Sequence, residues 1–275
     1  MMDQGTMENG VENVQRLPAT DDEFGGVVVE MKEHMDSEVF HTLLKTSMSL
    51  WKLQGKKGVW IKLPIYLSNL VDAAVKEGFW YHHAEPSYLM LLYWIPETQN
   101  PIPGNASHIA RVGAIVLNDK REMLVVQEKL GNLRGVWKIS TGITHEGEDI
   151  SVGVVREVKE ETGIDTEFVE VLAFSQHHKV FFGKSELLFL CMMRPLSFDI
   201  KIQETEIEAA KWMPLEEYAS QLSPQENGLR KYITELCIAK VDRDYSGFSP
   251  TLVTSYCDGN PSYIFLNKGD LNKQS

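Results

Sequence analysis

The chain has 275 residues, 43% of them hydrophobic, which supports a substantial core and excludes disorder as its main state. Its 39 acidic and 27 basic residues leave a formal net charge of −12, so binding to nucleic-acid phosphates is not expected. Three widely spaced cysteines, no secretory pattern and no apolar run of about 20 residues argue against a disulfide framework, a cysteine zinc site and a membrane span, and favour a cytoplasmic protein.

The first part of the chain divides into a polar start and a compact α/β unit. Residues 1–21 are polar and aperiodic, and we expect a disordered tail there. Residues 22–97 are expected to form a small domain with two helices, one capped by Asp36 or Ser37 and one beginning at Ser68. Its strands are expected at residues 27–29, 59–61, 79–83 and 88–95.

A proline-rich stretch separates this unit from the rest, and residues 98–105 are the expected linker. A larger α+β domain is expected over residues 106–241, followed by a C-terminal tail, residues 242–275, in which Tyr245 and Phe248 can dock on the core. Its strands are predicted at 112–117, 123–128, 136–139, 168–175, 187–193 and 208–213, and its helices at 150–162, 215–220 and 229–239.

Three glutamates gather on one face of the predicted helix 150–162. Glu157, Glu160 and Glu161 stand at i, i+3 and i+4, where each like-charge pair costs roughly 0.2–0.5 kcal/mol. A bound cation would reverse this cost, and Mg²⁺ or Mn²⁺ fits best because hard ions prefer carboxylate oxygens. Arg156 can orient a metal-binding carboxylate. Taken alone, these residues also fit a solvated surface helix.

The same helix carries an apolar stripe that we expect to hold it on the sheet. Val152, Val155 and Val158 form this stripe and leave the acidic edge open. Gly163 is expected to end the helix in the left-handed conformation, and Gly142 to lie in a loop where the backbone turns closely. The sequence therefore predicts a rigid platform for a metal ion.

The wider spacing resembles the motif of a known family. The pattern G-x5-E-x7-R-E-U-x-E-E-x-G-U, with U a bulky aliphatic residue, is matched at every fixed position by Gly142, Glu148, Arg156, Glu157, Val158, Glu160, Glu161, Gly163 and Ile164. This is the Nudix box, and the chain from about residue 106 to 240 resembles a Nudix hydrolase. The resemblance implies an α/β/α sandwich that hydrolyses a nucleoside diphosphate linked to another moiety, with Mg²⁺ or Mn²⁺ on the three glutamates.

The flanking segments resemble a narrower group, the plant cytosolic Nudix pyrophosphatases that act on ADP-ribose and NADH. The resemblance is carried by Leu124–Glu128, Gly135–Lys138, Arg156–Phe174, Glu206–Pro214 and, in the first domain, Gln54–Trp60 and Tyr81–Glu85. In that group the first domain is a pre-Nudix domain resembling half of an acetyltransferase fold, and we expect it to pack against a partner subunit in a homodimer or to shape the substrate entrance.

Three features depart from that group. Ser140 stands where a proline is usual, Ser175 stands where an arginine is usual, and the loop before Trp137 is shorter. Because a guanidinium grips phosphate in a bidentate way, the serine at position 175 makes substrate preference less certain than reaction class.

The expected reaction is metal-dependent hydrolysis of ADP-ribose or NADH to AMP and a phosphorylated fragment. The ligand is then a small nucleotide, with no nucleic acid or membrane partner. Glu157, or a glutamate outside the box, would take the proton; Glu206 ranks ahead of Glu204 and Glu208.

Two other functions stay open: a non-catalytic sensor for ADP-ribose or NADH, and a Nudix enzyme for coenzyme A or diadenosine polyphosphates. An acetyltransferase is disfavoured because residues 22–95 lack that family's coenzyme A loop. The paired histidines at 82–83 and 177–178 are not expected to chelate a metal jointly, because neighbours on a strand point to opposite faces.

Overall fold

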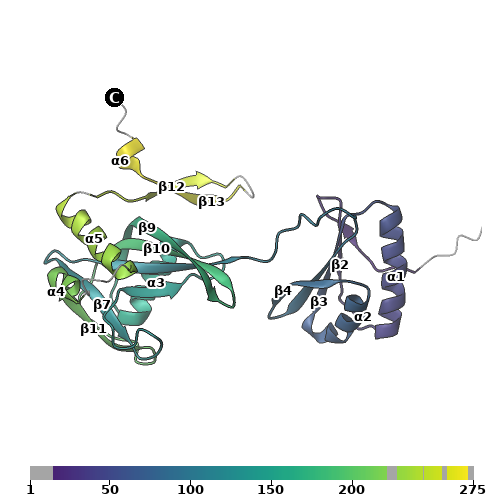
Figure 1. Cartoon of the computed structure of the whole chain (residues 1–275), viewed down its shortest axis with the longest axis horizontal. Coiled ribbons are helices and arrows are strands. Elements are labelled where there is room, and N and C mark those ends of the chain that lie inside the picture. Colours follow the sequence, from purple (N-terminus) through teal and green to yellow (C-terminus); the bar gives the residue numbers. More distant parts are fainter. Residues whose placement is uncertain (1–14, 222–227, 244, 256–258, 272–275) are drawn as a thin grey trace, which may run out of the picture. The chain divides into compact units, whose positions relative to one another are not determined.

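The computed structural model describes residues 15–221, 228–243, 245–255 and 259–271. The chain forms two compact units, Met1–Ala106 and Ser107–Ser275, each with its own hydrophobic core (Figure 1). Within these described ranges, no helix is both long and apolar enough to cross a membrane.

A mixed five-stranded sheet forms the first unit, in the order β1-β2-β3-β5-β4. Helix α1 begins where expected, because the Asp36 carboxylate accepts hydrogen bonds from the backbone N–H groups of Glu38 and Val39. The second helix differs from the prediction: a 3₁₀ turn precedes it, so Ser68 lies before its start. The elements are β1 Thr20–Asp21, β2 Val27–Glu30, α1 Ser37–Leu53, β3 Gly58–Pro64, η1 Ile65–Leu70, α2 Val71–Lys76, β4 Trp80–Glu85 and β5 Tyr88–Trp94.

The start of the chain is more ordered than expected. Residues 1–14 lie outside the described residues, but Leu17 is buried and its N–H donates to Ser47 Oγ at 2.9 Å. Residues 20–21 then pair with β2. The expectation of disorder was wrong for this part, because one leucine in a polar run suffices to attach the segment to the core.

The first pair of histidines also differs from the prediction. The β4–β5 register shifts between Tyr81 and His83, which marks a bulge. The bulge turns both rings to the same side, so the Nδ1 atoms of His82 and His83 lie 2.8 Å apart. In the expected linker, the Pro103 carbonyl lies 3.0 Å from His82 Nε2 and the Thr98 carbonyl accepts from Trp94 Nε1. The linker therefore lies on the first unit's sheet.

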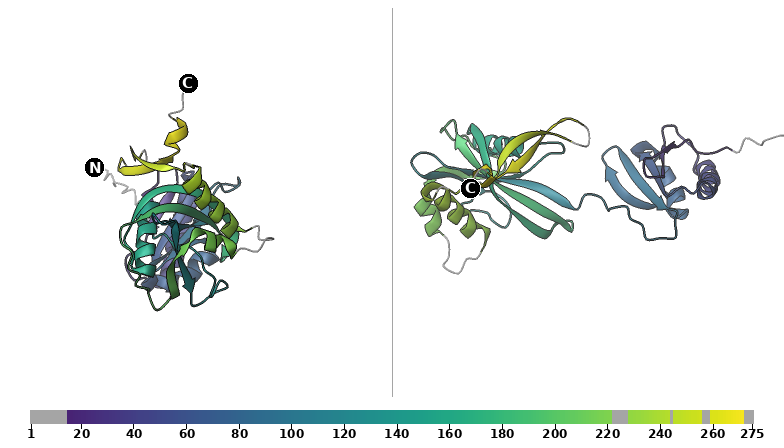
Figure 2. Two further views of the ribbon diagram at one scale, coloured as in Figure 1. Left: turned by 90° about the vertical axis from the view of Figure 1, so that its left-hand side faces the viewer. Right: turned by 90° about the horizontal axis from the view of Figure 1, so that it is seen from above.

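The second unit is an α/β/α sandwich. Its four-stranded sheet has the order β8-β6-β10-β9, in which β6 and β10 are parallel, and strands β7 and β11 pair beside it. Helix α3 covers one side and α5 the other, as the views in Figure 2 show. The elements are β6 His108–Val116, β7 Glu122–Glu128, β8 Ser140–Ile143, α3 Ile150–Thr162, β9 Thr166–Phe181, β10 Lys184–Pro195, β11 Ile207–Pro214, α4 Leu215–Ser220 and α5 Leu229–Asp242.

Alternation along β6 separates the two cores. Val112 and Ala114 pack against Val154 and Val158 of α3, whereas Ile115 belongs to the core on the α5 side. The apolar stripe predicted for α3 was therefore partly wrong: Val152 is 55% exposed while Val154 is fully buried. Two residues of helix rotate a side chain by about 200°, so only one of these two valines can face the sheet.

Two further predictions changed in the second unit. The strand expected at 136–139 is instead β8, which begins at Ser140, and Lys138 makes only an isolated bridge with Val126. The expected C-terminal tail contains a hairpin of β12, Ser249–Thr254, and β13, Pro261–Leu266, followed by α6, Lys268–Leu271.

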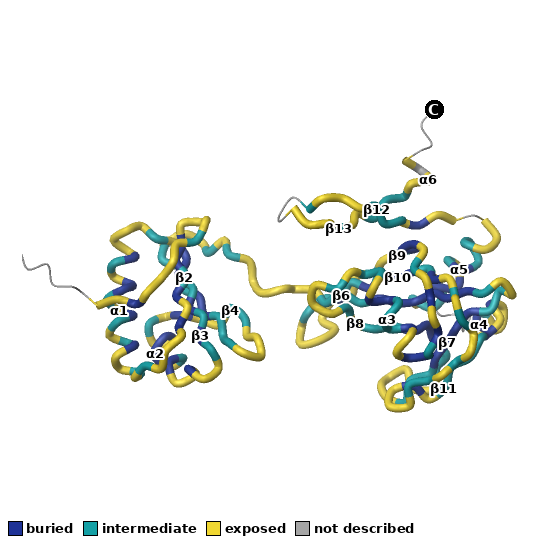
Figure 3. The backbone as a smooth tube through the Cα atoms, turned by 180° about the vertical axis from the view of Figure 1, so that it is seen from behind, coloured by how far each residue is buried: buried dark blue, intermediate teal, exposed yellow. Residues whose placement is uncertain are grey.

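The docking of the C-terminal segment is confirmed. Tyr245 OH donates to the Leu172 carbonyl at 3.0 Å, and Phe248 exchanges backbone hydrogen bonds with Val171. In the hairpin that follows, half of the strand residues are exposed and none is fully buried (Figure 3). Phe265 of β13 packs against the core on the α3 side and lies edge to face with Phe168 of β9, so the segment contacts the sandwich both at its base and through the hairpin.

Candidate active site

Helix α3 is held at both ends by the residues of the box. Its C-terminal residue Gly163 has φ of +72° and donates its N–H to the Lys159 carbonyl at 2.9 Å. At the other end, Glu148 Oε2 accepts from the backbone N–H of His145 at 2.9 Å. The glycine thus ends the helix as its sequence position indicated.

Gly142 explains how the helix can lie close to β8. It pairs with Val112 in β6, and a Cβ built on it would lie 1.8 Å from Glu157 Cδ. No side chain larger than hydrogen fits between this strand and the carboxylate. The expectation that Gly142 lies in a turning loop was wrong: it lies within β8, and glycine is required there because the Glu157 carboxylate packs against it.

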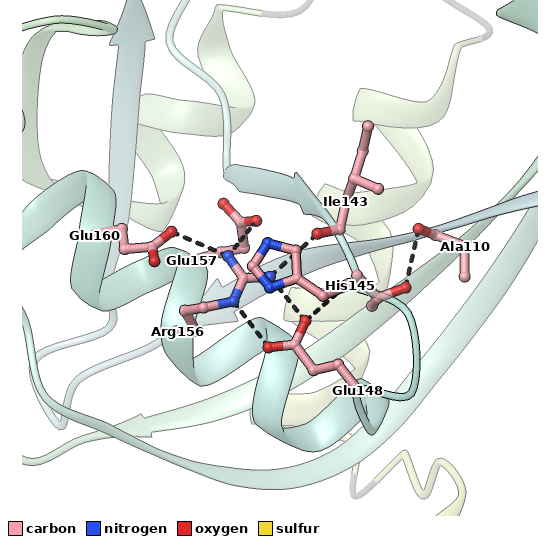
Figure 4. A network of polar contacts seen from close by, with 8 residues as sticks. Ala110, Ile143, His145, Glu148, Arg156, Glu157 and Glu160 are labelled. Atoms are coloured by element: carbon pink, nitrogen blue, oxygen red, sulfur yellow. Dashed lines mark hydrogen bonds and ion pairs between the residues drawn. The ribbon is translucent and has the colours of Figure 1, made fainter. Parts of the chain in front are cut away.

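Arg156 is the centre of the polar network in Figure 4. Its Nε and Nη2 donate to the two oxygens of Glu148, both at 2.8 Å, while Nη1 reaches Glu157 Oε1 at 2.8 Å and Glu160 Oε2 at 2.9 Å. Nη2 also reaches the Ile143 carbonyl at 3.1 Å. These hydrogen bonds from Arg156 are the main reason that the pKa of Glu148 is lowered to about 2. The arginine fixes the acidic face, as a residue behind metal ligands should.

Glu161 has a different environment from its two neighbours. It is 7% exposed, and burial is the main reason that its pKa is raised to about 7. The nearby Ser140 hydroxyl and Lys138 favour the ionised form, although Ser140 Oγ and Glu161 Oε2 do not reach hydrogen-bond geometry with each other. Glu161 Oε2 has no hydrogen-bond partner among the residues that the structure describes. A buried carboxylate oxygen of this kind favours a cation.

The acidic helix face opens into a cavity of about 420 Å³. Of the three glutamates considered as proton acceptors, all are exposed, but only Glu206 is among the residues that line this cavity. The complete lining is Arg111, Glu128, Thr141, Gly142, Ile143, His145, Arg156, Glu157, Glu160, Glu161, Gln203 and Glu206.

The sequence did not single out Arg111, Glu128 or Gln203. Glu128 ends β7 and forms an ion pair with Lys138 Nζ at 2.5 Å, and Arg111 lies in β6. Arg111 and Glu128 come from strands that precede the box, and Gln203 comes from the loop between β10 and β11, so no spacing rule connects them to it. Strand pairing brings the first two to the cavity, and this loop brings Gln203.

The carboxylates present fit a divalent metal ion by their chemistry. Arg156 occupies one oxygen of Glu157 and one of Glu160, which leaves the other oxygen of each outside this network. With Glu161 Oε2, the cavity offers three carboxylate oxygens and no thiolate. In the described part of the chain, no three acidic, histidine or cysteine side chains already converge on one point. Glu160, which is 55% exposed, is the side chain with room to rotate.

The second unit is thus a sandwich in which helix α3 contributes carboxylates to a cavity, a combination that suits a divalent metal ion. The family model of the Nudix hydrolase domain matches residues 17–95, and that of the NUDIX domain matches residues 107–236. Nudix hydrolase 2 and Nudix hydrolase 10 from Arabidopsis thaliana are each 54% identical to the chain. These matches cover 94% and 95% of this chain and 93% and 94% of the relatives.

Among solved structures, a MutT NUDIX hydrolase from Burkholderia pseudomallei is 22% identical, with a TM-score of 0.38 over 46% of this chain and 95% of that one. The chain belongs to the Nudix hydrolase family, which hydrolyses the pyrophosphate bond of nucleoside diphosphate derivatives and uses divalent metal ions.

Proposed function

We propose that this chain hydrolyses the pyrophosphate bond of ADP-ribose, NADH or both, giving AMP and a phosphorylated fragment. The observation that carries the proposal is the cavity that Glu157, Glu160 and Glu161 line together, with one buried Glu161 oxygen lacking a hydrogen-bond partner among the described residues. The size of about 420 Å³ is in the range of ligand pockets.

The three glutamates would hold Mg²⁺ or Mn²⁺, and Arg156 and Gly142 fix their positions. When bound, such an ion neutralises phosphate charge and lowers the pKa of a bound water. Glu206 lines the same cavity and is the residue outside the box that we assign as additional base or ligand. Glu128, which the sequence did not indicate, is in a position to do the same.

Turnover tests the reaction directly. Purified protein with Mg²⁺ is incubated with ADP-ribose, NADH, coenzyme A, diadenosine polyphosphates and oxidised nucleoside triphosphates, and products are read by mass spectrometry. We expect AMP from ADP-ribose or NADH. If another compound of the panel is the only one hydrolysed, the substrate assignment is wrong and that compound takes its place. If no compound is hydrolysed, the proposed reaction is refuted.

The metal assignment is tested by Glu160→Gln, with Glu208→Gln as a matched control outside the cavity. Glu160 is partly exposed, so the amide should leave the fold intact. We expect kcat to fall by more than about a hundredfold, the upper range for partners behind a metal ligand, because one carboxylate charge is lost. Equal activity of this variant and the control would contradict the assignment.

One observation favours a second candidate, a non-catalytic sensor that binds ADP-ribose or NADH. The pairing of Arg156 with both Glu157 and Glu160 satisfies these carboxylates without a metal ion. Calorimetry that shows tight binding of ADP-ribose in Mg²⁺, with the ligand recovered intact, would establish the sensor instead of the enzyme.

We also propose a cytoplasmic homodimer. The two described cysteines, Cys191 and Cys237, are free and buried, as suits a reducing compartment. Strand β4 is at the edge of its sheet and exposes Trp80 and Tyr81, which supports contact with a second copy. Light scattering should give twice the chain mass of 31.2 kDa, and cell fractionation tests the compartment.

A further inference from the structure

The catalytic cavity has a second, cationic side that the box does not supply. Arg111 lines the cavity from β6 and is held by two partners: its Nη1 donates to Glu186 Oε2 and its Nη2 to Thr141 Oγ1, both at 3.2 Å. Glu186 is 8% exposed, so the guanidinium is fixed by a buried carboxylate. Arg111 therefore has a defined orientation before any ligand enters.

Thr141 joins this arginine to a second cation. Its Oγ1 accepts from Lys138 Nζ at 3.0 Å as well as from Arg111. A hydroxyl has two acceptor lone pairs and one donor hydrogen. Because both lone pairs are occupied, the only hydrogen bond left to Thr141 is one that it donates, and Thr141 lines the cavity.

The arginine also has donors to spare. Two of its five N–H groups are used in these contacts, and its buried Nε finds no hydrogen-bond partner among the described residues. Arg156, the other arginine lining the cavity, is already occupied by three glutamates. The cavity thus has two different sides: Arg111 has N–H groups that these contacts do not use, whereas Glu157 and Glu160 each keep a carboxylate oxygen that Arg156 does not occupy.

We propose that Arg111 and Thr141 bind a phosphate oxygen of the substrate's diphosphate, on the side of the cavity away from the metal-binding glutamates. The assignment rests on the proposed function for the identity of the ligand. A diphosphate supplies acceptor oxygens on both of its phosphates, and a planar guanidinium binds phosphate in a bidentate way. Glu186 and Lys138 act as positioning residues for this pair.

Strand register shows which residues share a face of the sheet with Arg111. Arg111 in β6 and Ser175 in β9 both pair with Leu188 of the strand between them, so all three point to one face of the sheet. Arg111 therefore places its positive charge in the same row as Ser175.

Two variants and two matched controls test the assignment. Thr141→Val removes the hydroxyl but keeps the Arg111–Glu186 pair, so it remains informative if Arg111→Gln does not fold. Thr144→Val is its control, because Thr144 Oγ1 donates to the Ala110 carbonyl and Thr144 does not line the cavity. Arg194→Gln is the control for the arginine, because Arg194 forms a similar pair with Glu167 between β10 and β9.

Binding is measured by calorimetry in Ca²⁺ with ADP-ribose, ADP and adenosine as probes, and chromatography verifies that each probe stays intact. We expect both site variants to lower the affinity for ADP-ribose and for ADP by about tenfold or more and to leave the affinity for adenosine unchanged. The loss should be larger than in the control variants. In turnover with Mg²⁺, KM should rise more than kcat falls.

Three results would overturn the assignment. Loss of ADP-ribose binding with ADP binding unaffected would mean that Arg111 and Thr141 contact the terminal ribose and not the diphosphate. Equal behaviour of site variants and controls would show a purely structural role, and failure of the wild-type protein to bind ADP-ribose and ADP would remove the ligand class. Because binding needs no turnover, a wild-type protein that binds but does not hydrolyse refutes the proposed reaction while the phosphate contact stands.

Discussion

At the scale of single residues, Gly142 is needed for the space that it leaves rather than for its backbone freedom. A Cβ there would overlap the Glu157 carboxylate, the group that Arg156 holds in place. The position of Glu157, a proposed metal ligand, thus depends on a residue with no functional group. This dependence gives a simple test of whether the position of Glu157 controls activity.

Gly142→Ala should displace the Glu157 carboxylate and lower kcat by about tenfold or more, the range seen when a metal ligand loses its support. Gly104→Ala is the control, because a Cβ at Gly104 meets nothing within 4 Å. The measurement is steady-state turnover of the substrate that the panel identifies. Equal kcat values for the two variants would show that the enzyme tolerates a shift of Glu157.

Glu148 gives a prediction about acid stability. Arg156 holds its pKa at about 2, below its ordinary value of 4.5, so the unfolded chain takes up this proton first as the pH falls. The stability from this pair is therefore fully present above about pH 5 and is lost as the pH falls from about 4.5 to about 2.

Glu148→Gln should accordingly have a free energy of unfolding about 1–2 kcal/mol lower than the wild type at pH 7, the size expected for a charged hydrogen-bonded pair near the surface. The difference should shrink below about pH 4.5. Urea unfolding followed by circular dichroism at several pH values measures it. A difference that stays constant down to pH 3 would show that ionisation of Glu148 contributes nothing.

At the scale of elements, helix α3 is the part on which the site depends. Val154 and Val158 anchor it on the sheet, while the residues between and after them carry the acidic groups. Gly163 ends it, and a Cβ at that position would lie 2.9 Å from Lys201 Cβ in the loop between β10 and β11. The helix end is therefore constrained both by its backbone conformation and by a neighbour.

Gly163→Ala should lower the free energy of unfolding by about 1–3 kcal/mol, since a left-handed φ and a steric contact act together. Gly183→Ala separates the two effects, because Gly183 also has a positive φ, of +77°, but open space around its Cβ position. We expect the second variant to lose less stability in urea unfolding. Equal losses would mean that Lys201 moves aside without cost.

At the scale of the whole molecule, the two units have separate cores. Leu17, α1 and the first sheet share one cluster of buried residues, and the sandwich contains the other two. Each unit therefore has the apolar interior that independent folding requires.

We expect fragments 15–106 and 107–275 to unfold cooperatively when expressed separately. Differential scanning calorimetry measures this, with the full chain as the reference. A fragment that shows no cooperative transition would mean that its core depends on the other unit. Fragment 107–275 should also keep the cavity that the proposed reaction uses.

Much of this protein followed from its sequence alone. Local periodicity indicated most strands and helices, and the spacing of Gly142, Glu148, Arg156 and the glutamates indicated the family motif, because positions a few residues apart on a helix meet whatever the rest of the fold does. Leu17, the histidine bulge and the C-terminal hairpin were not predicted. The burial of Leu17 depends on α1, which is distant in the chain, whereas the bulge and the hairpin arise in the pairing of neighbouring strands.

Only the tertiary structure decided which other residues meet the motif. Arg111 and Glu128 reach the cavity through strand pairing, and Glu206 through a loop, so their sequence positions carry no signal of this neighbourhood. Thr141 directly precedes Gly142, but only the pairing of β8 with β6 places it beside Arg111. Burial, too, depends on the fold: Glu161 and Glu160 are adjacent in the chain, yet one is enclosed and the other is half exposed. The sequence determined which chemical groups the helix carries, and the packing of strands around the helix determined which of them share one environment.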